Sequence, residues 1–184
     1  DIRSLDDFNG VWNLRINDFE DEFMISSSQM GPFPEELQVG LVNINERKVL
    51  LNFLDHKEVI PNNKNSVYDL KVIAGDQEYV KSMSQEILSS IPQEFSLGQN
   101  YPNPFNPITQ MEYSLPQSSK VIISIYNVLG QEIKTLVNKE QDYGYHYVSW
   151  DGTDRLGKSV ASGVYFTQMR SDGFSQSKKM LLLK

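Results

Sequence analysis

Carboxylates are the side chains whose spacing comes closest to a chemical site in this sequence of 184 residues. Asp18 and Glu20 belong to the acidic segment NDFEDEF, and Asp151 and Asp154 lie in the segment WDGTDRLGK. Carboxylates close together on a turn could hold Ca²⁺, which takes about six to eight oxygen ligands. Neither segment has the full ligand set of a calcium loop. A solvated acidic turn and a structural loop are therefore the favoured interpretations, with calcium as the alternative for each.

The other residue types that could do chemistry form no recognisable site. The sequence has no cysteine, which excludes disulfides, thiolate metal sites and cysteine nucleophiles. His56 and His146 are far apart in the sequence, which argues against a zinc site. No GxSxG, HExxH or phosphate-binding glycine loop is present. We therefore expect no enzymatic activity and no cofactor.

The net charge of −7 is unevenly distributed, with −8 on residues 1–91 and +1 on residues 92–184. A duplex nucleic-acid binder needs a basic face, so the acidic half argues against that class of protein. No apolar run is long enough for a transmembrane helix, so we expect no membrane insertion. The asymmetry favours two separately composed domains that meet near residue 91.

Short alternating runs rich in β-branched and aromatic residues, separated by Gly, Asn, Asp and Pro, predict an all-β protein. Strands are expected at 11–16, 23–27, 37–44, 48–54, 67–74, 78–82, 111–114, 120–126, 132–137, 144–150, 163–170 and 174–183. Gly75-Asp76 predicts a hairpin turn. The segment KSMSQEILSSIPQ is expected to be a linker with at most one helical turn. The resulting architecture is two Ig-like or β-sandwich domains in tandem, 1–82 and 94–184, joined by the linker 83–93.

The segment NYPNPFNP is incompatible with a helix or a central strand, because each proline fixes φ and removes a backbone donor. It consists of Asn100, Tyr101, Pro102, Asn103, Pro104, Phe105, Asn106 and Pro107. We expect an extended arm that covers a sheet edge and marks where the second domain starts. Tyr101 and Phe105 are expected to anchor this arm in the core, and the Asn side chains to bond to nearby backbone. A direct contact with a receptor is the alternative.

The segment WDGTDRLGKSVASGVY predicts a turn that defines the fold. Trp150 is expected in the core, and Asp151-Gly152 in a turn whose carboxylate accepts from the amide two residues on. Gly157 and Gly163 are expected to supply a positive φ or a close approach of the backbone.

Five blocks in this half occur in a fixed order: QNYPNPFNP, YSLP, IYNVLGQEIKTLV, WDGTDRLGKSVASGVYF and the closing KKMLLLK. With these blocks, residues 94–184 resemble the type A C-terminal sorting domain of the type IX (Por) secretion system. The core pattern WDG…SGVY also resembles the Ig-like domain of flagellar hook-capping proteins, which would imply a structural assembly scaffold instead.

The sorting-domain resemblance implies an Ig-like sandwich at the end of a larger exported protein. Its partners would be the outer-membrane translocon, the attachment machinery and upstream cargo domains of the same chain. Its location would be secreted or at the cell surface, reached through the periplasm. The ending would then be the recognised signal, which the translocon would bind by strand addition; the plainer interpretation is an edge strand whose lysines prevent aggregation. This ending consists of Lys178, Lys179, Met180, Leu181, Leu182, Leu183 and Lys184.

The first half resembles, in the spacing of its strands, the β-rich module that often precedes this sorting domain, which implies a spacer. A second possibility is a surface carbohydrate-binding module, which would need exposed aromatic side chains on one sheet face. The candidates are Phe8, Trp12, Phe19, Phe23 and Phe33, although most of them, Trp12 included, are better explained as core residues.

Overall fold

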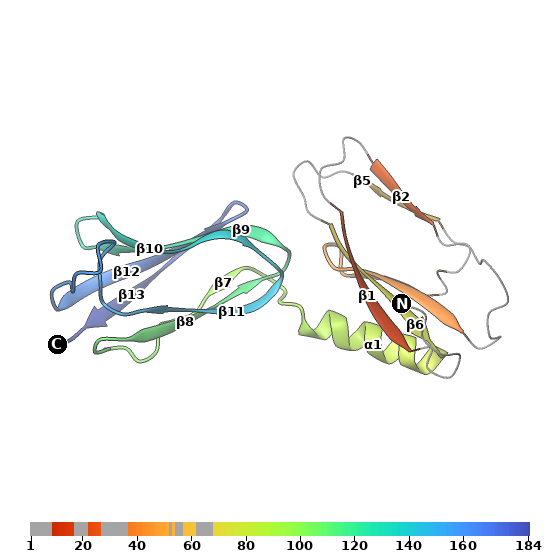
Figure 1. Ribbon diagram of the computed structural model, residues 1–184, viewed down its shortest axis with the longest axis horizontal. Helices are drawn as coiled ribbons and strands as arrows, with labels where there is room; N and C mark the ends of the chain where they lie inside the picture. Colours follow the sequence, from red (N-terminus) through yellow and green to blue (C-terminus); the bar gives the residue numbers. More distant parts are fainter. Residues whose placement is uncertain (1–8, 17–21, 27–36, 52, 54–56, 62–67) are drawn as a thin grey trace. The chain divides into compact units, whose positions relative to one another are not determined.

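The computed structural model describes residues 9–16, 22–26, 37–51, 53, 57–61 and 68–184. Its contacts divide the chain into two compact units, Asp1–Ser90 and Ile91–Lys184, which are called here the first and the second unit. Both units are built mainly from antiparallel strands (Figure 1). The predicted all-β class is therefore confirmed. Within these ranges, no helix is long and apolar enough to cross a membrane.

The second unit is a sandwich of two antiparallel sheets (Figure 1). The larger sheet has the order β10-β9-β12-β13, and the smaller one has the order β11-β8-β7. Their strands are β7 (Ser96–Leu97), β8 (Thr109–Leu115), β9 (Ser119–Asn127), β10 (Glu132–Gln141), β11 (Gly144–Trp150), β12 (Gly163–Ser171) and β13 (Phe174–Leu182).

Alternation of buried and exposed residues explains why these segments form a sandwich. On β9, Val121, Ile123 and Ile125 are fully buried, and on β12 Met169 is buried in the same way. Facing residues of the smaller sheet, among them Met111, complete a single core. Two sheets that each bury one side in this way pack face to face, as an Ig-like domain does.

A tight hairpin sets the register of the last strand. Asp172 and Gly173, between β12 and β13, both have positive φ angles, 43° and 78°. Turns of this kind match the twist of the flanking strands and fix their pairing. As a result, Phe166 lies opposite Lys179, and Val164 lies opposite Leu181.

The first unit contains a four-stranded antiparallel sheet with the order β1-β6-β3-β4 and a separate strand pair, β2-β5. Its strands are β1 (Gly10–Ile16), β2 (Glu22–Ser26), β3 (Gln38–Asn43), β4 (Lys48–Leu50), β5 (Lys57–Pro61) and β6 (Tyr68–Gly75). Strand β5 was not predicted, because the run KEVIP is short and ends in proline. Strand β4 is shorter than the expected strand at 48–54.

The expected strand at 78–82 and the linker that follows it are wrong, because residues Gln77–Ser90 form the helix α1. Asp76 is its N-cap rather than half of a hairpin turn, since its Oδ1 accepts from the amide of Tyr79 at 2.7 Å. The helix buries Val80, Ser84 and Ile87, which lie on one face at helical spacing. It packs against β3 and β6. This spacing was the sequence signal that distinguished a helix from a strand.

Trp12 was expected in a core, and that prediction is wrong. Its side chain is 47% exposed on β1, which is an edge strand of its sheet. The indole lies over Gly10, where a Cβ would come within 2.5 Å of the ring. The buried core of this unit is instead built around Leu41, Tyr68 and Leu70.

Candidate functional site

The proline-rich arm, residues 100–107, lies along the outer edge of β13. The amide of Phe105 donates to the carbonyl of Leu181 at 3.0 Å, and the amide of Leu183 donates to the carbonyl of Phe105 at 2.9 Å. The Asn103 side chain accepts from the amide of Leu181 at 3.0 Å and donates to the carbonyl of Lys179 at 3.4 Å. Gln99 also donates to that carbonyl, at 2.8 Å. The arm and the preceding Gln99 therefore form hydrogen bonds with the edge backbone groups of Lys179, Leu181 and Leu183 in and after β13.

The predicted cover over a sheet edge and the predicted bonds from Asn side chains are present. The prediction of an extended arm is wrong, because the segment pairs with both sheets and has to bend between them. Tyr101 pairs with Gln110 of β8, and Phe105 pairs with Leu182 of β13. The peptide bonds before Pro102, Pro104 and Pro107 are all cis. Asn100 fixes the first bend, with its amide donating to the carbonyl of Pro102 and to the hydroxyl of Thr109.

Only one of the two expected anchors enters the core. Phe105 is 2% exposed, and its ring lies 5.6 Å from that of Trp150, measured between centroids. Tyr101 is 83% exposed, so its prediction as a second anchor is wrong. Its backbone pairing with Gln110 directs its side chain to the outer face of the smaller sheet, whereas Phe105 points between the sheets.

Three segments that are far apart in the sequence meet at this end of the second unit. Trp150, predicted in the core, is 1% exposed and contacts Phe105. Gly152 has a φ of 68°, and a Cβ there would meet the Pro107 carbonyl oxygen at 3.3 Å and Leu182 at 3.5 Å. The predicted turn thus packs on both the arm and the terminal strand. Gly157 also has a positive φ, 77°, and Gly163 opens β12.

The carboxylates of the loop 151–158 bind their own loop. Asp151 Oδ1 accepts from the Thr153 amide, as predicted, at 3.1 Å and from the Thr153 hydroxyl at 2.6 Å. The bond from the Thr153 hydroxyl, together with the Lys134 ammonium whose Nζ lies 3.2 Å from Asp151 Oδ1, holds the pKa of Asp151 below its ordinary value. Asp154 Oδ1 accepts from the amides of Leu156 and Lys158, both at 2.9 Å. Among the residues the structure describes, no three metal-binding side chains lie together.

The remaining predicted chemical residues do not join this region. Asp18, Glu20, His56, Phe8, Phe19 and Phe33 lie outside the described residues, and of Phe23 only the backbone is described. The ring of His146 stacks on that of Tyr113, with 5.3 Å between centroids, and its Nε2 lies 2.7 Å from the carbonyl oxygen of Asp142. His146 is therefore held by the second unit's own residues.

The closing segment divides its side chains between core and solvent. Met180 and Leu182 are fully buried, whereas Lys179 is exposed and Leu183 is 48% exposed. Leu181 and Lys178 are half-buried, on opposite faces of the strand. Lys184 donates from its ammonium group to the carbonyl of Val160. Strand β13 is an edge strand, as predicted, and its outward face combines a lysine with apolar side chains.

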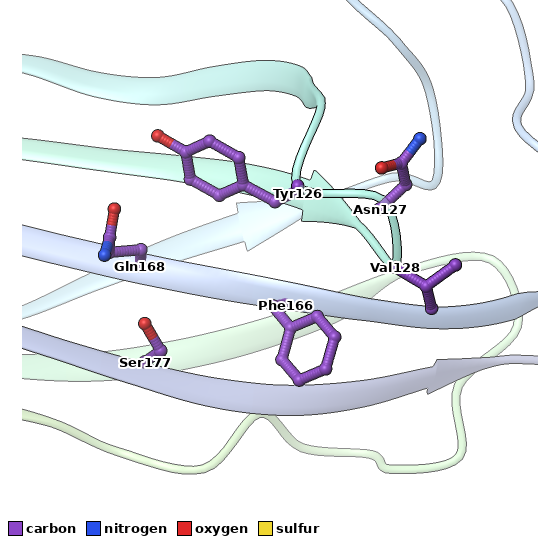
Figure 2. Close-up of a pocket in the computed structure, with 7 residues that line it drawn as sticks. Tyr126, Asn127, Val128, Phe166, Gln168 and Ser177 are labelled. Atoms are coloured by element: carbon purple, nitrogen blue, oxygen red, sulfur yellow. The ribbon is translucent and has the colours of Figure 1, made fainter.

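A shallow depression of about 320 Å³ lies on the same outer face of the larger sheet, beside Lys179. Figure 2 shows its lining, with Phe166 and Gln168 from β12, Ser177 from β13 and Tyr126 from β9. Phe166 is 36% exposed and lies opposite both Tyr126 and Lys179 in the sheet. Val128, in the turn after β9, adds a further exposed apolar side chain at the rim.

Sequence reasoning missed Phe166 and Val128, because in the last strands it considered only the closing segment for recognition. The available signal was alternation: on β12, Tyr165 and Thr167 are buried, so an aromatic residue between them must face outward. An outward Phe next to an outward Lys is a feature that alternation alone could have indicated.

Comparison with known proteins finds a matching family for part of the second unit. Residues 108–173 match the FlgD Ig-like domain. This match agrees with the Ig-like sandwich that the strands of the second unit form. The matched residues include neither the proline-rich arm nor β13. No curated protein matches the chain.

Three solved structures are similar to parts of the chain. FlgD from P. aeruginosa has 26% identity over 41% of this chain and 59% of its own, with a TM-score of 0.32. PorZ, a surface component of the type-IX secretion system of Porphyromonas gingivalis, has 16% identity over 67% of this chain and 16% of its own, with a TM-score of 0.35. Dimeric latent PorU from Porphyromonas gingivalis has 12% identity over 95% of this chain and 18% of its own, with a TM-score of 0.42. The chain spans less than two thirds of each of these proteins.

Proposed function

We propose that the second unit is a non-catalytic sorting module of a larger exported protein, and that the type IX secretion machinery reads the outward face of β13. The observation that carries the proposal is the convergence of three segments: the proline-rich arm, the turn at Trp150-Gly152 and the terminal strand. These are also blocks on which the resemblance to the type A sorting domain rests. The destination would be the cell surface or the medium, reached through the periplasm.

The contacts of the arm narrow how β13 could be recognised. Strand addition needs free backbone groups along an edge. Along the edge of β13, four backbone groups between Lys179 and Leu183 are already bonded to the arm or to Gln99. These are the Lys179 carbonyl, the Leu181 amide and carbonyl, and the Leu183 amide. Recognition therefore uses side chains, and the outward ones are Lys179, Leu181 and Leu183, next to the depression at Phe166. Exposed apolar patches that are rimmed by polar residues often mark protein-binding surfaces.

An export assay tests this proposal with substitutions that leave the core intact. The complete chain is fused to a periplasm-directed reporter in a bacterium with a type IX system. The double variant Lys179→Glu/Leu183→Ser changes only outward side chains, and Lys139→Glu/Leu156→Ser is its matched control at exposed positions on β10 and in the loop 151–158. We expect the first variant to remain in the periplasm and the control to be exported. Equal export of both would refute the proposal.

A structural assembly scaffold of the hook-capping kind is the second candidate function. It is favoured by the match of residues 108–173 to the FlgD Ig-like domain. Such a scaffold would self-assemble or bind a filament subunit, and its export would not depend on the outward face of β13. Sedimentation of the purified chain, alone and with a filament protein of the same bacterium, distinguishes the two functions.

A further inference from the structure

The outer face of the smaller sheet carries exposed tyrosines that the sorting proposal does not use. Tyr145 and Tyr147 follow each other on the outward side of β11 and are 59% and 61% exposed. Tyr101, 83% exposed, pairs with Gln110 of β8 on the side of that strand away from β11. Directly paired residues of antiparallel strands project to the same side of a sheet. All three rings therefore lie on one face, because Gln110 is outward between the buried Thr109 and Met111.

Polar side chains lie between these rings, and a glycine lies beside them. Glu112 pairs with Tyr147 on one side, and on the other side its carbonyl accepts from the amide of Gly98 at 2.7 Å. Gly98 therefore lies on the side of Glu112 away from Tyr147, where a Cβ would come within 3.0 Å of the Glu112 carbonyl oxygen, so only backbone occupies this position. From strand spacing and rise, Tyr147 and Tyr101 are about 12 Å apart between their Cα atoms.

One of the rings is held in place before any ligand arrives. The hydroxyl of Tyr147 donates to Glu112 Oε2 at 2.6 Å. This bond raises the pKa of Tyr147, so the phenol is protonated at neutral pH. A ring whose orientation is already fixed loses less conformational entropy when a ligand stacks on it.

We propose that this face, formed by Tyr101, Tyr145 and Tyr147 around Glu112, Gln110 and Gly98, binds a neutral linear oligosaccharide. Sugar rings present flat C–H faces to aromatic rings and hydroxyl groups to amides and carboxylates, and this face offers both. Across this face, the row Tyr147, Glu112 and Gly98 and the row Ser149, Gln110 and Tyr101 contain no aliphatic side chain, unlike the apolar surface around Phe166. The Glu112 carboxylate disfavours an acidic polysaccharide. The inference goes beyond the proposed sorting function and does not depend on it.

Calorimetric titration of the complete chain with cellohexaose and maltohexaose tests the proposal. We expect saturable binding of at least one of them, weakened about tenfold or more in Tyr147→Ala and in Tyr101→Ala, because each loses one stacking ring. Phe166→Ala, which removes an exposed aromatic ring from the opposite sheet, is the matched control and should bind as the unchanged chain does. Hexagalacturonate, an acidic probe of the same length, should bind more weakly than the neutral sugars.

Circular dichroism of each variant establishes that the fold is intact, and a second pair of aromatic substitutions, Tyr147→Phe and Tyr101→Phe, keeps the stacking surface. Retained binding in the Phe variants would separate ring stacking from a loss of structure. Absence of binding for both neutral hexasaccharides at millimolar concentration would overturn the inference. So would binding that survives both Ala substitutions.

Discussion

Individual side chains in the proline-rich arm have opposite roles although they belong to one motif. Phe105 is buried against Trp150, and Tyr101 is almost fully exposed. The sequence could predict the arm itself, because three prolines within eight residues exclude regular structure. It could not predict which aromatic residue is buried, since this depends on the arm pairing first with β8 and then with β13.

Phe105→Ala should lower the free energy of unfolding of the second unit by about 3–5 kcal/mol, as expected when a large buried aromatic side chain is removed. Tyr101→Ala should change it by less than about 0.5 kcal/mol, because an exposed side chain loses few contacts on truncation. Urea unfolding followed by circular dichroism measures both values. A similar loss for both variants would mean that Tyr101 is also an anchor.

A pH titration examines the bond between Tyr147 and Glu112. The folded chain raises the pKa of Tyr147 above its ordinary value of 10.0, first through the hydrogen bond to Glu112 and then through the charge of that carboxylate. The bond therefore contributes fully to the stability of the fold at a pH below 10.0, the ordinary pKa of Tyr147, and this contribution is lost as the pH rises through the raised pKa. Glu112→Gln removes the charge and should lower the pKa of Tyr147. The ring carbon signals of Tyr147 in NMR spectra report it, and an unchanged pKa would contradict this origin.

At the scale of elements, local patterns predicted most strands but not their partners. Alternation located β9 and β12 correctly, since their buried residues follow period two. The same criterion failed at α1, where Tyr79 and Val80 were taken for part of a strand although Val80, Ser84 and Ile87 have helical spacing. The contact between the arm and β13 joins residues almost eighty positions apart, so no local pattern contains it.

Asn103→Ala should loosen the arm without disturbing the core. The variant loses the bond from the Leu181 amide and the weaker one to the Lys179 carbonyl, so we expect a loss of about 0.5–1.5 kcal/mol. Hydrogen exchange of the Leu181 amide should accelerate, whereas the amide of Ile123, inside the same sheet, should keep its rate. Unchanged exchange at Leu181 would show that Asn103 does not hold this edge of β13.

At the scale of the whole molecule, the two units differ in how much their sequence indicates about function. The second unit has the motifs, the Ig-like sandwich and an edge strand with a distinct outward face. The first unit has a sheet against which α1 packs. We propose that this unit is a spacer. Its expected carbohydrate site depended on exposed aromatic residues, and of the candidates only Trp12 has a described side chain, which is exposed. The exposed tyrosines of the second unit form a better-defined sugar face.

Site-specific photo-crosslinking during export tests the central claim, that the outward face of β13 is the part of the chain that the secretion machinery contacts. A photoreactive residue replaces Leu183 in one chain and Leu156, in the loop 151–158, in another; both are exposed. Both chains are expressed as cargo in a bacterium with a type IX system and irradiated while they cross the periplasm. We predict adducts with an outer-membrane component of that system from position 183 and none from position 156. Export that proceeds without an adduct from position 183, or with equal adducts from both positions, would contradict the claim.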